Sequence, residues 1–205
     1  MLNIVPNKEE FHKGIKEFEK HEKRDAMYKV ATFLVSYFWG KPSDMADGLG
    51  VLLLTWNQAF YRYGIFDFNI LEKSISKNLK YLVEFRKKDI TTLSDEDEDK
   101  IRDICDDFIV ALQIAVGKSK GKKSPVSVSK ALHLLAPDFF PLWDHKIARA
   151  YGCYYGFNPT EKYISFCKIM RYITKEVKDY IESSNKSILK LIDEYNYSKY
   201  TKGWI

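Results

Sequence analysis

The chain has 205 residues, of which 45% are hydrophobic and 30% are charged, a balance that excludes a disordered or fibrous protein. Its length allows a single domain over residues 1–205, or two closely packed helical lobes over 25–117 and over 118–205 with the N-terminal helix, to bury a core without disulfides or metals. The formal net charge of +5 permits a polyanionic partner without requiring one.

The N-terminal third of the chain predicts three helices. Over residues 7–24, apolar side chains recur at spacings of three and four among Glu and Lys, which is typical of a peripheral surface helix. Residues 25–40 are apolar on nearly all sides, so we expect a central helix there. Ser43 or Asp44 can cap a third helix, which runs to Tyr63 and ends at the following glycine.

Two further helices are predicted in the middle of the chain. One starts at Asp67 or Asn69 and ends in the basic cluster 86–88, where cations are favourable at a helix C-terminus. The next starts at Ser94 and has the acidic run 95–99 in its first turn. A solvated helix start explains this run better than a metal site, because five carboxylates without glycine or asparagine do not form a calcium loop.

The C-terminal half predicts four more helices, at 124–135, 144–151, 159–181 and 184–195, with an ordered loop at 136–143. No alternating pattern is long enough to predict a strand, and no internal repeat is visible. We therefore expect an all-α protein that forms a compact helical domain.

Three cysteines, Cys105, Cys153 and Cys167, include no Cys-x-x-Cys pair and have no histidine at metal-ligand spacing. We expect buried, reduced thiols and neither a metal nor another cofactor. No apolar run approaches the roughly 20 residues of a membrane span, and the first 20 residues lack the apolar run of a signal peptide. These features predict no membrane contact and a cytoplasmic location.

The sharpest local charge feature is the basic loop 117–123. Its four lysines are Lys118, Lys120, Lys122 and Lys123. Placed beside a helix start, they could neutralise several phosphates of a nucleic-acid backbone, and a solvated linker is the alternative. The loop does not fit a nucleotide phosphate loop, because the earlier glycine of that motif would fall at Leu112, inside an apolar run, and no strand precedes it.

The stretch 124–152 holds the pattern with the clearest functional implication. Lys130 comes early in a predicted helix, a stiff loop with two prolines and three aromatic residues follows, and Asp144 takes the N-cap position of the next helix. Ile147 and Arg149 follow the aspartate at matching positions, and this segment resembles the active-site segment of the helix-hairpin-helix DNA glycosylases, which remove damaged bases from DNA.

The resemblance implies a two-lobed helical fold with a cleft, and double-stranded DNA as the partner, with the damaged base flipped out. It implies that Lys130 attacks the sugar C1′ and forms a Schiff base, while Asp144 stabilises the positive sugar or takes the lysine proton. Ser127 and Ser129 stand where the family's hairpin has glycines that approach a phosphate, which makes them candidate DNA contacts. The structural alternative is that Asp144 is only a helix cap and Lys130 an exposed lysine.

Three residues near this pair are further candidate DNA contacts. His133, one turn beyond Lys130, could meet a phosphate or a base, although a partly buried structural histidine is the favoured interpretation. His145 follows Asp144 where related families carry a polar DNA contact, and Arg149 matches the arginine of the family segment.

A second candidate surface lies in the stretch 54–63. Trp56 belongs to an aromatic helix face that could sandwich a flipped base, and Asn57 and Arg62 could form the pocket wall beside it. The alternative is that the aromatic residues are core and the amides cap neighbouring helices.

These features leave three functions open. The first is a DNA-repair glycosylase with lyase activity through a lysine Schiff base. The second is a non-catalytic nucleic-acid-binding protein of the same fold, and the third is a helical interaction protein. The C-terminal segment 195–205, rich in Tyr and Lys, either packs back on the fold or mediates dimerisation.

Overall fold

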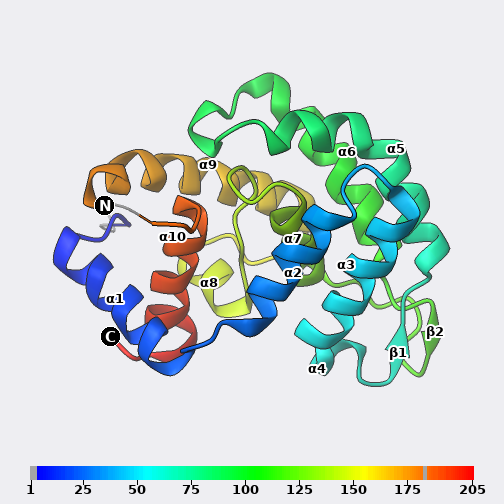
Figure 1. Cartoon of the computed structure of the whole chain (residues 1–205), viewed down its shortest axis with the longest axis horizontal. Coiled ribbons are helices and arrows are strands. Elements are labelled where there is room, and N and C mark those ends of the chain that lie inside the picture. The colour runs from blue at the N-terminus through cyan, green and yellow to red at the C-terminus, as the bar shows by residue number, and fades with distance from the viewer. Residues whose placement is uncertain (1–3, 182–183) are drawn as a thin grey trace.

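The computed structural model describes residues 4–181 and 184–205, and its architecture is all-α, as predicted (Figure 1). Within these ranges the α-helices are α1 (Lys8–His21), α2 (Ala26–Tyr37), α3 (Pro42–Trp56), α4 (Gln58–Tyr61), α5 (Phe68–Arg86), α6 (Asp95–Ala111), α7 (Pro125–Leu135), α8 (His145–Ala150), α9 (Pro159–Val177) and α10 (Ile188–Asn196). The remaining short elements are the 3-10 turns η1 (Ile90–Thr92) and η2 (Lys178–Tyr180), the π-helical turn η3 (Tyr197–Lys202), and strands β1 (Gly64–Ile65) and β2 (Val116–Gly117).

Helix α7 is the central element of the fold. In Figure 1, α1, α9 and α10 lie on the left, α3, α5 and α6 lie on the right, and α7 runs between them. Contacts of α7 with α2, α3, α6 and α9 join the two sides, and one apolar core extends through all of them. The division of the chain into two lobes stays a prediction.

The predicted helix starts are largely confirmed. Asp67 caps α5 by accepting a hydrogen bond from the Asn69 N–H at 2.8 Å, and the Ser94 N–H donates to Asp97 at 3.0 Å in the first turn of α6. Ser124 caps α7. These signals are reliable because a cap satisfies donors only two or three residues away and needs no distant partner.

The prediction that 25–40 forms a central helix is wrong. Helix α2 buries only Ala31 and Val35, whereas Val30, Phe33 and Tyr37 have 50%, 66% and 72% of their surface exposed. The helix is apolar all round, but it packs one face on α3 and α7, and its other face meets solvent. Composition alone cannot tell a covered apolar face from an open one.

The predicted helix from Ser43 or Asp44 to Tyr63 is in fact two helices. Helix α3 starts one residue earlier, at Pro42, and ends at Trp56, because the backbone of Asn57 (φ −113°, ψ 35°) leaves the helical region before α4. Neither predicted cap is the N-cap, which is Lys41.

A two-stranded antiparallel pair, missed by the sequence analysis, follows this break. Gly64 of β1 pairs with Gly117 of β2. A Cβ atom at Gly117, where φ is +118°, would lie 2.2 Å from the Tyr63 carbonyl oxygen, so only glycine fits there. Two residues per strand are too few to give an alternating pattern.

The C-terminal segment packs back on the fold. The Ser198 hydroxyl donates to the Gly14 carbonyl of α1 at 2.7 Å, and the rings of Trp204 and His21 stack with their centroids 4.2 Å apart. Turn η3 also contacts α8. The C-terminal segment therefore packs against both α1 and α8.

The three cysteines, Cys105, Cys153 and Cys167, are buried free thiols, as predicted.

Candidate functional site

Helix α7 and the break after α3 together position the candidate nucleophile, Lys130. The Lys130 Nζ donates to Asn57 Oδ1 at 2.7 Å and to the Trp56 carbonyl at 3.2 Å, and it lies 4.5 Å from the Trp56 ring centroid. Because the helix breaks at Asn57, that amide and the carbonyl before it are free to face α7. Among the residues that the structure describes, two neutral acceptors and an aromatic face hold the amine, and no ion pair does.

Burial lowers the pKa of the Lys130 amine to about 8, because the charged form loses its hydration. The carboxylates of Asp193 and Asp144 act in the opposite direction and limit the fall. A lysine with its ordinary pKa is almost wholly protonated near neutral pH, whereas this amine has an appreciable neutral fraction. A neutral amine can act as a nucleophile.

Asp144 lies at the start of α8. Its Oδ1 accepts hydrogen bonds from the backbone N–H groups of Lys146 and Ile147, both at 2.8 Å, and its Oδ2 accepts one from the Thr201 hydroxyl. The first two contacts confirm the predicted N-cap. The third ties the C-terminal segment to α8, a contact that the sequence does not indicate.

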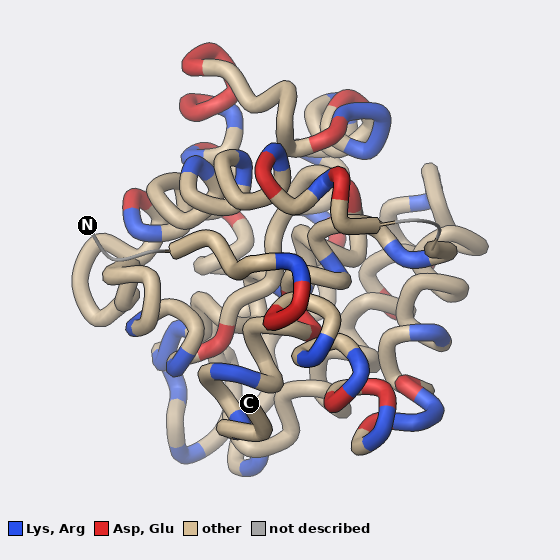
Figure 2. Tube along the Cα trace, turned by 90° about the vertical axis from the view of Figure 1, so that its left-hand side faces the viewer, with Lys and Arg blue, Asp and Glu red and all other residues tan. Residues whose placement is uncertain are grey.

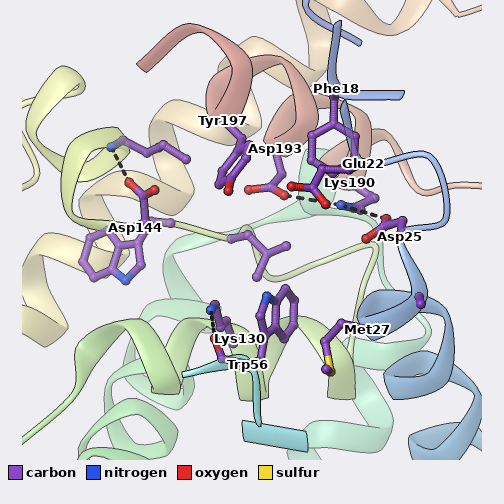
Figure 3. Close-up of a pocket in the computed structure, with 14 residues that line it drawn as sticks. Phe18, Glu22, Asp25, Met27, Trp56, Lys130, Asp144, Lys190, Asp193 and Tyr197 are labelled. Atoms are coloured by element: carbon purple, nitrogen blue, oxygen red, sulfur yellow. Dashed lines mark hydrogen bonds and ion pairs between the residues drawn. The ribbon is translucent and has the colours of Figure 1, made fainter. Parts of the chain in front are cut away.

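Lys130 and Asp144 line one pocket with a volume of about 380 Å³ (Figure 3). This volume falls in the range of roughly 300–1,000 Å³ that is usual for small-molecule sites. The walls come from α1, α2, α3, α7, α8 and α10, with aromatic surface from Phe18, Trp56 and Tyr197. The charged lining residues are Glu22, Asp25, Lys130, Asp144, Lys190 and Asp193. Carboxylates outnumber amines in this lining, although the chain as a whole is basic.

The wall opposite Lys130 holds a buried charge cluster on α10 (Figure 3). The Lys190 side chain is 3% exposed, and its Nζ lies 3.3 Å from Asp25, 3.6 Å from Asp193 and 3.5 Å from Glu194. Burial raises the pKa of Asp193 to about 6, and the neighbouring Lys190 offsets this only in part.

The sequence analysis missed this cluster. A signal was present, because Lys190, Asp193 and Glu194 lie at helical spacings of three and four inside an otherwise apolar helix. Charged residues on the buried side of a helix are uncommon, because each needs a partner of opposite charge to offset its loss of hydration.

Of the second candidate surface, Trp56 and Asn57 reach the pocket region, whereas Arg62 does not line it. Trp56 lines the pocket. Asn57 is 9% exposed, and its Nδ2 donates to Ser127 Oγ at 2.7 Å while its Oδ1 accepts from Lys130, so it positions the amine. Arg62 is exposed beyond the helix break, lies over the Tyr63 ring at 5.4 Å and is not among the residues that line the pocket.

Two predicted DNA contacts on α7, Ser127 and Ser129, are corrected, because their side chains are fully buried. Ser127 bonds to Ser124 and Asn57, and Ser129 donates to the carbonyl of Val126. Both serines therefore fix α7 against its neighbours and do not face a ligand.

His133 is also buried, with 0% of its surface exposed, as the structural interpretation of this residue predicts. Its Nδ1 is 2.8 Å from the Phe140 carbonyl, and its Nε2 is 3.0 Å from the Tyr28 hydroxyl. Burial lowers the pKa of the imidazole to about 4. The imidazole therefore fastens α2 and the loop after α7 to α7 and does not contact a nucleic acid.

His145 and Arg149 are exposed on α8, immediately after Asp144. The Arg149 Nε donates to His145 Nε2 at 3.1 Å, and its guanidinium lies 4.3 Å from the Tyr154 ring centroid. Their position next to the pocket-lining aspartate leaves both residues available to an outside partner.

The four lysines of the basic loop are exposed, and they belong to the connection that carries β2. In Figure 1 the β1–β2 pair lies at the lower right, whereas α8 and α10, which border the pocket, lie in the left half. The loop is therefore separate from the pocket. Figure 2 shows Lys and Arg interspersed with Asp and Glu over the side that it presents, so charges of both signs mix there.

Within residues 4–181 and 184–205, no group of three or more His, Cys, Asp or Glu side chains is placed to hold a metal ion. In the same part of the chain, no helix has the length and apolar character that crossing a bilayer requires. Comparisons with protein-family models, with curated proteins and with solved structures find no match.

Proposed function

We propose that this protein is a DNA glycosylase with lyase activity, in which Lys130 attacks C1′ of a flipped, damaged nucleotide and forms a Schiff base. One observation carries the proposal: a desolvated amine, held by two neutral acceptors, lines the same pocket as the carboxylate of Asp144. The resemblance of the 124–152 segment to helix-hairpin-helix glycosylases supports the same assignment.

The proposed reaction needs a nucleophile and a stabiliser of positive charge. The neutral Lys130 amine forms a bond to C1′, and the bond from C1′ to the base breaks, with its electron pair leaving on the base. The sugar ring then opens at O4′, and one proton passes from the nitrogen to that oxygen. The product is a protonated Schiff base, which can go on to cleave the strand by elimination.

The composition of the pocket fits this chemistry. Positive charge develops on the sugar as the base leaves, and the carboxylates of Asp144 and Asp193 in the lining favour it electrostatically. The Trp56 ring offers an aromatic surface beside the amine for a flipped base.

Non-catalytic nucleic-acid binding is the second candidate, and the exposed lysines of the 117–123 loop favour it. Because this loop lies away from the pocket, DNA could bind there without any reaction at Lys130.

Trapping with borohydride tests the proposed reaction. We expect the wild-type protein, mixed with borohydride and a duplex that carries one abasic site or one damaged base, to form a covalent adduct. We expect Lys130→Ala to reduce the adduct by at least about 100-fold, because the nucleophile is removed. Lys80→Ala, at an exposed lysine of α5, is the matched control and keeps wild-type yield. An adduct that persists undiminished in Lys130→Ala contradicts the proposal.

The same material separates the alternatives. Salt-sensitive duplex binding without an adduct, unaffected by Lys130→Ala, indicates a binding protein. If the protein does not bind DNA at all, both nucleic-acid functions fail, and a helical interaction protein remains.

A further inference from the structure

The Asp144 carboxylate already accepts three hydrogen bonds from the protein. Oδ1 accepts two backbone hydrogen bonds at the start of α8, and Oδ2 accepts the Thr201 hydroxyl. These three donors hold the carboxylate in one orientation as the cap of α8. Three of the roughly four acceptor sites of the carboxylate are therefore used, and a carboxylate with fewer hydrogen-bond partners is better suited to receive the proton that the amine loses.

Asp193 is the second carboxylate that faces this space. Figure 3 shows it on the wall above the pocket, with Lys130 on the opposite wall. Its side chain is 14% exposed, and among the described residues its one ion pair is with Lys190 at 3.6 Å, longer than a hydrogen bond. The carboxylate is thus buried at the edge of the pocket with spare capacity to accept a proton.

We propose that Asp193, rather than Asp144, takes up the proton that the Lys130 amine loses when it forms a Schiff base. This inference rests on the proposed function for its substrate, although the proton transfer applies to any carbonyl compound in the pocket. In the DNA reaction, the nitrogen passes one proton to the Asp193 carboxylate, and the carboxylic acid then donates it to the departing O4′. No proton is gained or lost by the enzyme.

Electrostatic coupling supports the choice between the two carboxylates. Asp193 raises the pKa of Lys130 more strongly than Asp144 does, and Lys130 in turn lowers the pKa of Asp193. Burial holds the pKa of Asp193 near 6 and that of Lys130 near 8. Between these values Asp193 is ionised and can accept a proton, while a fraction of the amine is neutral and can attack.

Other charged or titratable groups face Asp193 from each element around it. They are Lys190 and Glu194 on α10, Lys130 on α7, Asp144 at the start of α8, Asp25 and Tyr28 at the start of α2, Glu22 at the end of α1, and Tyr197 on η3. Substituting Asp193 removes its proton site and leaves those of these neighbours in place. The test therefore compares complete pH profiles and does not rely on rates at a single pH.

The experiment measures Schiff-base formation from pH 5 to pH 9 in the wild type, Asp193→Asn and Asp193→Glu. One substrate is an abasic-site duplex with borohydride. The other is glycolaldehyde with cyanoborohydride, with capture at Lys130 read by mass spectrometry. Asp47→Asn, at an exposed carboxylate of α3, is the control for charge removal and keeps the wild-type profile.

We expect the logarithm of the wild-type DNA rate to rise with a slope of about two below pH 6, where both groups must lose a proton, and about one between pH 6 and 8. Asp193→Asn should show a slope of about one at all pH values below the pKa of Lys130, and a DNA rate lowered by roughly 100-fold. Its glycolaldehyde midpoint should fall by about half a pH unit or more, since a charge that favours the ammonium ion is gone. Asp193→Glu should restore in part the steeper slope below pH 6.

The shift of the glycolaldehyde midpoint to lower pH separates the loss of Asp193 from damage to the fold, because damage to the fold would slow both reactions without that shift. The proposal is overturned if the wild-type slope is about one below pH 6, a result that needs no variant to fold, or if Asp193→Asn leaves both profiles unchanged. A third outcome is that the wild type traps no DNA, while its glycolaldehyde profile is still steep below pH 6 and the midpoint still falls in Asp193→Asn. The DNA substrate is then wrong, and the role of Asp193 stands.

Discussion

Lys130 and His133 lie three residues apart on α7, and burial lowers the pKa of both side chains. Their surroundings give this shift different consequences. The Lys130 amine lines a pocket and is held by acceptors that leave its lone pair usable when it is neutral. Both nitrogens of His133 are engaged inside the core. Residue type and spacing alone do not distinguish a reactive group from a structural one.

The buried His133 makes a prediction for stability against pH. Its pKa is about 4 in the folded protein and near 6.5 when unfolded, so only the unfolded chain takes up a proton as pH falls from 6.5 to 4. The folded state therefore loses stability over this window, by about 2 kcal/mol between pH 7 and pH 5. Urea unfolding at both values should show this loss in the wild type and its absence in His133→Gln.

Asp193 acts in the opposite sense over part of the same window. Its folded pKa of about 6 lies above the ordinary value, so the folded state gains stability as pH falls below 6. The comparison with His133→Gln cancels this contribution, because Asp193 is present in both proteins. If the free energy of unfolding falls equally in the wild type and in His133→Gln, then His133 has the same pKa in the folded and the unfolded chain.

At the scale of elements, the two helix ends that border the pocket decide its geometry. Helix α3 stops at Trp56, which turns the Asn57 amide toward Lys130. Helix α8 starts at Asp144, whose second oxygen binds Thr201 and so holds the C-terminal segment against α8. A continuous helix in place of α3 and α4, as the sequence indicated, would have carried Asn57 past the amine.

Two substitutions at Asp144 separate its capping from its chemistry. Asp144→Asn keeps an acceptor oxygen for the first turn of α8 and should unfold at nearly the wild-type urea concentration. Asp144→Ala should lose about 1–2 kcal/mol, because two backbone donors lose their acceptor. If the negative charge stabilises the sugar cation, both variants should give less borohydride adduct. If Asp144→Asn gives as much adduct as the wild type, the residue acts only as a helix cap.

For the whole molecule, the distribution of charge matters more than its net value. The net charge is +5, yet the pocket lining is acidic and the basic loop 117–123 lies away from it. A long polyanion could touch both the loop and the pocket, whereas a small ligand would meet only the acidic lining. Affinity for duplex DNA therefore depends on surfaces outside the pocket.

The loop can be tested by comparing variants of equal charge. Lys122→Ala with Lys123→Ala should weaken duplex binding and lower the slope of log affinity against log salt by about 0.9 for each phosphate that the loop no longer neutralises. Lys13→Ala with Lys16→Ala, at exposed positions of α1 on the other side of the molecule, makes the same change in net charge. Fluorescence anisotropy at several salt concentrations measures both. Equal effects of the two pairs would exclude a specific role for the loop.

The sequence by itself determined the features that depend on near neighbours. Helical periodicity gave the all-α class and most helix bounds, and caps such as Asp67, Ser124 and Asp144 appeared where expected, because their hydrogen bonds span only two or three residues. The resemblance of the 124–152 segment singled out Lys130 and Asp144; that both residues line one pocket is seen only in the structure.

Only the tertiary structure decided which side chains lose water and which charges meet. Ser127 was predicted to face DNA but is buried, because α3 covers that side of α7 through Asn57. Asp193 was overlooked, because nothing local to α10 indicates that it faces Lys130 across a pocket. Desolvation and Coulomb interactions act through space between residues far apart in the chain, and so they exist only once the helices have packed.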